Sequence, residues 1–191
     1  MKPLGVVLAG GASLRMGGDK ALIEVAGRTM LSWVAAALRK VCDEVLMTGR
    51  VGVTEGLAGI LDDLPGPRGP LAGIVTGLGV AAGRPLLAVA VDHPWIRLET
   101  LARLAESLNG AVPVEAGVRQ VTCACYPASL LEVARAELER GGSVQSLLDR
   151  EPLPEIGQDV WETWGEDGRS WWSVDDMTSL HEGLSRFGPP G

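Results

Sequence analysis

The chain has 191 residues, of which 46% are hydrophobic and 21% are charged, so we expect about one domain with a sizeable core. Its formal net charge is −7. Because no cluster of Lys and Arg forms a basic stripe, nucleic acid is excluded as an expected partner.

No apolar stretch of the sequence is long enough to cross a bilayer, and no signal peptide precedes the first predicted strand. We therefore expect a cytoplasmic protein without a membrane partner. The cysteines agree with a reduced compartment, because they form no disulfide-like framework. Cys123 and Cys125 are spaced like half of a metal site, but no further cysteine completes one. We expect both in the core, where free cysteines commonly lie.

Short apolar runs alternate along the chain with segments of helical periodicity. The apolar runs predict strands over residues 4–9, 44–48, 58–61, 86–91, 111–115 and 120–126. Periodicity and capping residues predict helices over 30–42, 70–82, 98–108, 128–140 and 144–149, the last with Ser143 as its N-cap. After residue 151 the pattern weakens, and we expect a strand over 171–174 and a last helix over 179–186.

This alternation predicts a single-domain, Rossmann-like α/β fold, with a mostly parallel sheet and helices on both faces. In such folds ligands bind beyond the carboxyl ends of the strands. Three of these ends carry Gly10-Gly11, Asp62-Asp63 and Asp92, which are residue types that a nucleotide and metal site needs. We assign the domain to residues 1–187 and expect the Gly/Pro tail over 188–191 to be disordered.

The segment from Leu8 to Lys20, LAGGASLRMGGDK, follows the first predicted strand. Its glycines allow backbone N–H groups to approach an anion closely, and Arg15 and Lys20 add two positive charges, a combination that suits a triphosphate. The segment lacks both the Gly-Lys-Ser/Thr of a Walker A loop and the G-x-G-x-x-G dinucleotide fingerprint. The alternative is a glycine-rich connection between strand and helix whose charges are incidental.

Asp92 follows the most apolar predicted strand and precedes His93 and Pro94. A carboxylate there is costly unless it faces a cleft, a partner or a metal, and its hard oxygens suit Mg²⁺. The alternative is a turn residue at the end of the strand. His93 adjoins this position, but transfer to an ionised phosphate needs no base. His181 is expected on the surface of the last helix.

Three segments together resemble one family. The segment from Leu8 to Lys20 resembles the L-A-G-G-x-S-x-R-M-G-x-D-K signature of molybdenum cofactor guanylyltransferases, in the nucleotidyltransferase superfamily. The sequence GPLAGI at 69–74 is similar to the family's second motif, and VDHP at 91–94 is similar to its third. The resemblance covers at least residues 4–127. Superfamily members that use CTP usually begin L-A-A-G, so Gly11 favours guanine.

The resemblance implies a Mg²⁺-dependent nucleotidyltransferase that binds GTP, transfers GMP to molybdopterin and releases pyrophosphate. It also implies contacts with other cofactor-biosynthesis proteins and with chaperones of molybdoenzymes. Two alternatives stay open. One is a cytidylyltransferase or another nucleotidyltransferase with a different phosphorylated acceptor, and the other is a nucleotide-binding protein without turnover.

The resemblance, with the charge of Arg15, also suggests roles for single residues. The expected catalytic residues are Arg15, Lys20 and Asp92. The expected nucleotide contacts are Leu8, Ala9, Gly10, Gly11, Lys20, Met47, Asp63 and Asp92. Two of these depend on register, because Thr48 could replace Met47 at a position that is often Asn in the family, and Asp62 could replace Asp63.

The expected metal ligands are Asp92 and Asp175. The family usually continues with Thr-Pro-Glu after the second of these positions, and this chain does not, so the alternative for Asp175 is the N-cap of the last helix. The acceptor is expected near residues 120–126.

Overall fold

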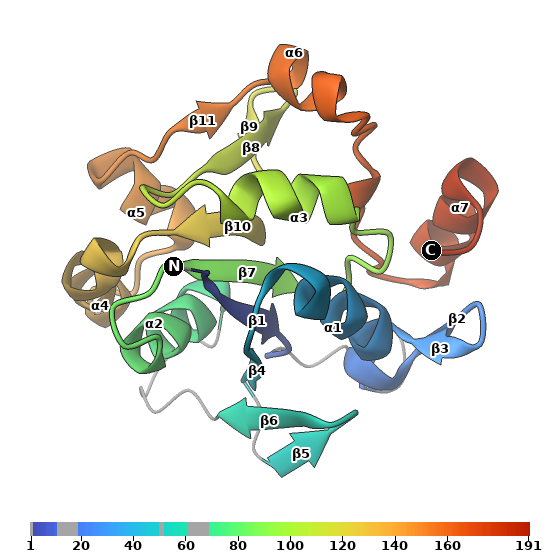
Figure 1. Cartoon of the computed structure of the whole chain (residues 1–191), viewed down its shortest axis with the longest axis horizontal. Coiled ribbons are helices and arrows are strands. Elements are labelled where there is room, and N and C mark those ends of the chain that lie inside the picture. The colour runs from blue at the N-terminus through green and yellow to red at the C-terminus, as the bar shows by residue number, and fades with distance from the viewer. Residues whose placement is uncertain (1, 11–18, 50–51, 61–68) are drawn as a thin grey trace.

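The structure, a computed structural model, describes residues 2–10, 19–49, 52–60 and 69–191. Its main sheet has six strands in the order β10-β7-β1-β4-β6-β5, with helices on both sides (Figure 1). The strands are β1 (Leu4–Leu8), β4 (Val45–Thr48), β5 (Gly52–Thr54), β6 (Leu57–Ile60), β7 (Leu86–Ala90) and β10 (Cys123–Tyr126). The four central strands are parallel, whereas β5 and β10 at the edges are antiparallel to their neighbours. The predicted fold is confirmed.

Two hydrophobic layers hold helices on the two faces of this sheet. Helices α1 (Met30–Val41) and α3 (Leu98–Ala105) cover one face, and α2 (Pro70–Val80), α4 (Leu131–Glu139) and α5 (Val144–Arg150) cover the other. Because alternate residues of a strand point to opposite faces, Val7 of β1 packs in the first layer and Val6 in the second. Both side chains are fully buried.

Local capping sets where several helices begin. Thr29 Oγ1 accepts a hydrogen bond of 3.0 Å from Ser32 N at the start of α1. Pro70 opens α2 and Ser143 is the N-cap of α5, as the sequence predicts. Ser143 also forms a capping box with Ser146. These caps satisfy backbone N–H groups that a helix cannot pair internally.

Smaller elements lie outside the main sheet. Strands β2 (Glu24–Val25) and β3 (Arg28–Thr29) form a hairpin. Strands β8 (Val112–Glu115), β9 (Val118–Arg119) and β11 (Glu155–Ile156) form a second sheet in the order β11-β8-β9. Helices α6 (Gln158–Trp161) and α7 (Met177–Phe187) complete the chain, and short 3₁₀ turns lie over Lys20–Leu22, Ala128–Leu130, Glu162–Trp164 and Arg169–Trp171.

The C-terminal segment differs from its predicted structure. The predicted strand over 171–174 is wrong, because a 3₁₀ turn occupies Arg169–Trp171 and Val174 N instead donates a hydrogen bond of 2.9 Å to Asp92 O. The last helix begins at Met177, with Asp176 as its N-cap. The sequence predicts a disordered tail over 188–191, whereas Trp95 Nε1 donates a hydrogen bond of 2.7 Å to Gly188 O.

The three cysteines are free and buried. Burial raises the pKa of the Cys42 and Cys125 thiols to about 12. Cys123 and Cys125 pack among apolar side chains of the first layer, so their predicted core position is confirmed. Among the residues that the structure describes, no helix is long and apolar enough to span a membrane.

Candidate functional site

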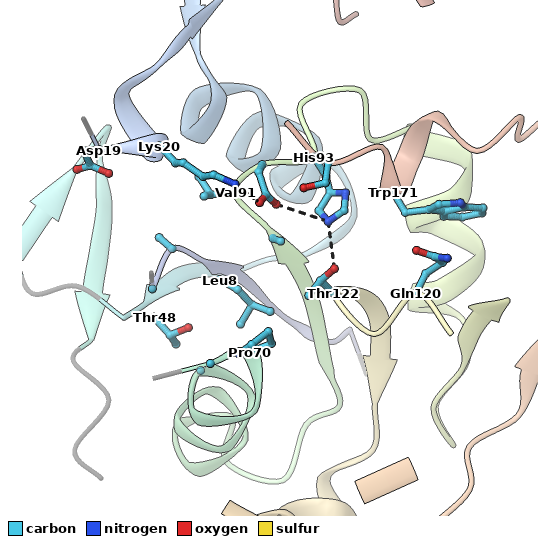
Figure 2. A pocket seen from close by; sticks show the side chains of 17 residues that line it. Leu8, Asp19, Lys20, Thr48, Pro70, Val91, His93, Gln120, Thr122 and Trp171 are labelled. Atoms are coloured by element: carbon cyan, nitrogen blue, oxygen red, sulfur yellow. Dashed lines mark hydrogen bonds and ion pairs between the residues drawn. The ribbon is translucent and has the colours of Figure 1, made fainter. Parts of the chain in front are cut away.

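A cleft of about 400 Å³ lies at the carboxyl ends of β1 and β7 (Figure 2). Such ends meet at one edge of a parallel sheet, which is where α/β folds bind ligands. The polar and charged side chains that line the cleft are Asp19, Lys20, Thr48, Asp92, His93, Gln120, Thr122 and Ser173. The cleft therefore contains side chains from both halves of the chain.

Lys20 joins two carboxylates in or beside this cleft. Its Nζ donates hydrogen bonds to Asp92 Oδ2 at 3.0 Å and to Asp175 Oδ1 at 2.7 Å. Lys20 opens a 3₁₀ turn whose N-cap is Asp19, with Asp19 Oδ1 accepting from Ala21 N at 3.1 Å. Lys20, Asp92 and Asp175, which were predicted from separate parts of the sequence, thus meet, and both carboxylates contact the Lys20 ammonium group.

The charges in this group depend on one another. Burial by itself would lower the pKa of Lys20, but the hydrogen bond to Asp175 and the charge of Asp92 outweigh it and raise that pKa. Burial by itself would raise the pKa of Asp92, but the positive charges of a protonated His93 and of Lys20 outweigh it and lower that pKa. Burial lowers the pKa of His93 and so favours its neutral ring. When His93 is neutral, Lys20 is the positive charge that remains in contact with Asp92.

The backbone of Asp92 holds the C-terminal segment against the end of β7. Val174 N donates to Asp92 O, and the next residue is Asp175, whose carboxylate contacts Lys20. The alternative that Asp175 caps the last helix is wrong, because Asp176 Oδ1 accepts from Ser179 N at 2.8 Å. The His93 ring lies beside the Asp92 carboxylate, and its Nε2 is 3.1 Å from Thr122 Oγ1.

Leu8, Ala9 and Gly10, three of the expected nucleotide contacts, line another part of the cleft wall. Gly49 follows β4 with a φ of +81°, and a Cβ there would lie 2.4 Å from Gly10 Cα. Only glycine allows this approach of the two chain segments. Figure 2 shows Leu8 and Thr48 on this side of the cleft and Gln120 and Trp171 on the far side.

Met47, an expected nucleotide contact, does not present its side chain to the cleft. It is fully buried in the first hydrophobic layer, whereas its neighbour Thr48 lines the cleft. This correction follows from the two-residue period of a strand, which sends neighbours to opposite faces. Thr48 Oγ1 is buried and has no hydrogen-bond partner in the described part of the chain.

Gly11, Arg15 and Asp63, three further expected site residues, lie outside the described residues. The structure also adds two residues that the sequence did not suggest, Trp171 and Ser173, and it places Thr122, from the range expected near the acceptor, in the lining of the cleft. One indication was available for Trp171, because four of the six tryptophans fall between residues 161 and 172. An aromatic cluster in an otherwise aromatic-poor chain marks a packed or binding surface.

A family model described as the MobA-like NTP transferase domain matches residues 5–155. The chain belongs to this family. A probable molybdenum cofactor guanylyltransferase of Bacillus licheniformis is 35% identical over 162 residues, which are 78% of this chain and 82% of the relative. A molybdenum cofactor guanylyltransferase of a Bradyrhizobium species is 36% identical over 149 residues, which are 70% of each chain.

Among solved structures, molybdopterin-guanine dinucleotide biosynthesis protein A from Archaeoglobus fulgidus superposes with a TM-score of 0.80. The match covers 95% of this chain and 97% of that chain at 17% identity, so it shows the fold alone. The family membership shows that the protein is a nucleotidyltransferase.

Proposed function

We propose that this protein binds GTP, transfers GMP to the terminal phosphate of molybdopterin and releases pyrophosphate. The names of its relatives support the base and the acceptor. The three free, buried cysteines fit a reducing compartment, so the proposed location is the cytoplasm.

The observation that carries this proposal is the position of the Lys20 ammonium group. It lies between Asp92 and Asp175, in the same cleft as Leu8, Ala9 and Gly10. Both carboxylates contact one nitrogen atom, at 3.0 and 2.7 Å, so their oxygens converge on a single cation position. A nucleotidyl transfer needs this pairing of a cation-binding group with an anion-binding loop, because charge builds on the phosphates during reaction.

The same two carboxylates fit Mg²⁺. Their oxygens are hard donors, and Mg²⁺ is commonly held by one or two carboxylates while water and phosphate oxygens complete its shell. The described residues contain no group of three His, Cys, Asp or Glu that could hold a metal by itself, which fits a metal that arrives with its nucleotide. Bound there, Mg²⁺ would neutralise phosphate charge and polarise the α-phosphate.

The residues of the chain would supply binding and orientation. Leu8, Ala9 and Gly10 receive the nucleotide, and Lys20 exchanges Asp175, whose side chain is 59% exposed, for the more highly charged triphosphate. The acceptor phosphate approaches from the side of Gln120 and attacks the α-phosphorus as the bond to the leaving pyrophosphate breaks. An ionised phosphate carries its own electron pair, so no side chain removes a proton in this step.

The proposal is tested by measuring the initial rate of pyrophosphate release from GTP and from CTP, each with and without molybdopterin. We expect release to require molybdopterin. We expect it to be at least about tenfold slower with CTP than with GTP, as happens when a polar edge is left unpaired. A faster rate with CTP would assign the protein to cytidylyl transfer. Release that does not depend on molybdopterin would contradict the proposed acceptor.

A further inference from the structure

A second cavity of about 370 Å³ adjoins the cleft and shares Gln120, Trp171 and Ser173 with it. Figure 2 shows Gln120 and Trp171 at the end of the cleft opposite Asp19 and Thr48. The second cavity therefore extends the cleft away from the start of the glycine-rich segment. Its size suits a bicyclic ring system, since small-molecule sites commonly have a few hundred Å³.

Glu115, the last residue of β8, lines this second cavity with its carboxylate held in place. Trp171 Nε1 donates a hydrogen bond of 3.0 Å to Glu115 Oε2. The Trp171 ring is itself fixed, because it packs edge-on against Trp161 with 5.3 Å between ring centroids. Glu115 is thus presented by a rigid indole.

The second oxygen of this carboxylate keeps its capacity to accept hydrogen bonds. No hydrogen bond from another described residue reaches Glu115 Oε1, and an ionised carboxylate has about four acceptor sites. Gly168 has a φ of +91°, and a Cβ at this position would lie 2.7 Å from Oε1. A glycine at this position leaves room for the carboxylate.

A fixed carboxylate beside an apolar indole recognises a flat heterocycle that carries two adjacent N–H donors. The 2-amino-4-oxopyrimidine edge of a pterin has this pattern, and so does the corresponding edge of guanine. The exposed guanidinium of Arg186 also borders the cavity, within 5.5 Å of the centroid of the Trp172 ring, and Glu182 lines the cavity with it.

We propose that Glu115 binds the amino-pyrimidinone edge of the acceptor's pterin ring and that Trp171 is the residue that positions Glu115. This inference rests on the proposed function. The pterin is favoured over guanine because the cavity lies beyond Gln120 and Trp171, whereas Leu8 and Gly10 line the nucleotide end of the cleft. With the pterin in the second cavity and GTP in the cleft, the acceptor's phosphate would meet the α-phosphate of GTP near the residues that the two cavities share.

The first test measures equilibrium binding of free pterin and of lumazine, which has an oxo group in place of the 2-amino group, to the full-length protein. We expect the wild type to prefer pterin by about tenfold or more, and Glu115→Gln to lose this preference, as happens when a site built for an N–H donor meets its analogue. Glu139→Gln, an exposed residue of α4, is the matched control and should behave as wild type. If Glu115→Gln fails to fold, the wild-type preference still tests the proposal.

The second test measures GTP affinity and the KM for molybdopterin in the same proteins. We expect Glu115→Gln to bind GTP within about twofold of wild type and to show a KM for molybdopterin at least about tenfold higher, with kcat little changed. Loss of GTP affinity would mean that the cavity holds guanine and would overturn the proposal. Equal binding of pterin and lumazine by the wild type would also overturn it.

The two proposals fail in distinguishable ways. If the wild type shows no turnover with molybdopterin, the proposed function fails, but the pterin and lumazine titrations still decide whether Glu115 reads this edge. If turnover is normal and Glu115→Gln is indistinguishable from wild type in both tests, the proposed function stands and the role of Glu115 is wrong.

Discussion

Lys20 donates hydrogen bonds to two carboxylates, Asp92 and Asp175, that the sequence separates by 72 and 155 positions from it. Two negative charges share one positive charge in this group, and the two side chains of the Lys20–Asp92 pair are 18% and 19% exposed. Partial burial makes their interaction stronger than that of a surface pair. The group therefore has one net negative charge, which can attract a further cation. When phosphates bind, Lys20 can contact them in place of a carboxylate.

We predict that Lys20→Ala lowers turnover at least about a hundredfold, because loss of one group that stabilises developing charge costs roughly 3 kcal/mol of barrier. Steady-state kinetics on a variant with unchanged circular dichroism would measure this. Lys40→Ala, an exposed position on α1, is the matched control. A change below about threefold in Lys20→Ala would remove Lys20 from the mechanism.

Residues of the site were predictable where local pattern alone carries the information. Lys20 and Asp92 follow strands and belong to short motifs, so the sequence placed both at the correct edge of the sheet. Trp171 and Ser173 reach the cleft only through tertiary packing of the second half of the chain. The side chain of Met47 points away from the cleft, because a shift of one residue in a strand reverses the side chain's direction.

At the scale of elements, a buried carboxylate organises the turn that carries Trp171. Glu166 is 3% exposed and accepts hydrogen bonds from Gly168 N at 2.9 Å and from Thr100 Oγ1 of α3 at 2.5 Å. It also accepts from the backbone N–H groups of Asp167 and Ser170. This residue joins α3 to the turn, and the turn forms the wall between the two cavities.

We predict that Glu166→Ala lowers the free energy of unfolding by at least about 3 kcal/mol, because several buried N–H and O–H groups lose their acceptor. For a chain of this size the melting temperature should fall by roughly 6–12 °C. Glu162→Ala provides the control, since Glu162 is exposed and its carboxylate accepts a hydrogen bond from the exposed Gln158 side chain. Equal melting temperatures for the two variants would contradict the role given to Glu166.

The sequence predicts the elements that have a local hydrophobic pattern and misses those that depend on tertiary contacts. Helix α1 and strand β7 have long apolar patterns, and their predicted positions agree with the structure within a residue. The two-residue strands β2, β3, β9 and β11 are too short to show a hydrophobic period. The predicted strand over 171–174 was wrong. The turn before it is fixed by hydrogen bonds to Glu166, and hydrogen bonds of this kind leave no hydrophobic pattern in the sequence.

At the scale of the whole molecule, the protein has a formal net charge of −7 and is proposed to bind two anionic substrates. General attraction therefore cannot bring them to the cleft, and binding must depend on local groups such as Lys20 and backbone N–H groups. The proposed Mg²⁺ would contribute to the same effect. Nucleotide binding is consequently expected to need Mg²⁺ and to be selective for its base.

We predict that GTP with Mg²⁺ raises the melting temperature by roughly 5–10 °C at about 100 times its Kd, which corresponds to about 2.7 kcal/mol. CTP, ATP and UTP at the same concentration should raise it far less. Thermal unfolding with each nucleotide, and with Mg²⁺ alone as the control, measures this. Equal shifts for all four nucleotides would contradict selective recognition of guanine.

If Asp92 holds the metal at which nucleotidyl transfer occurs, removing its charge should change how the rate depends on Mg²⁺. Mg²⁺ is titrated against the initial rate of pyrophosphate release in wild type and in Asp92→Asn, with Asp159→Asn, an exposed position on α6, as the control. Asn keeps the size and turn preference of Asp but lacks the charge. We predict that turnover collapses and that the Mg²⁺ concentration for half-maximal rate rises by about tenfold or more, as for a lost metal ligand. Overlapping Mg²⁺ curves for wild type and Asp92→Asn would contradict the account.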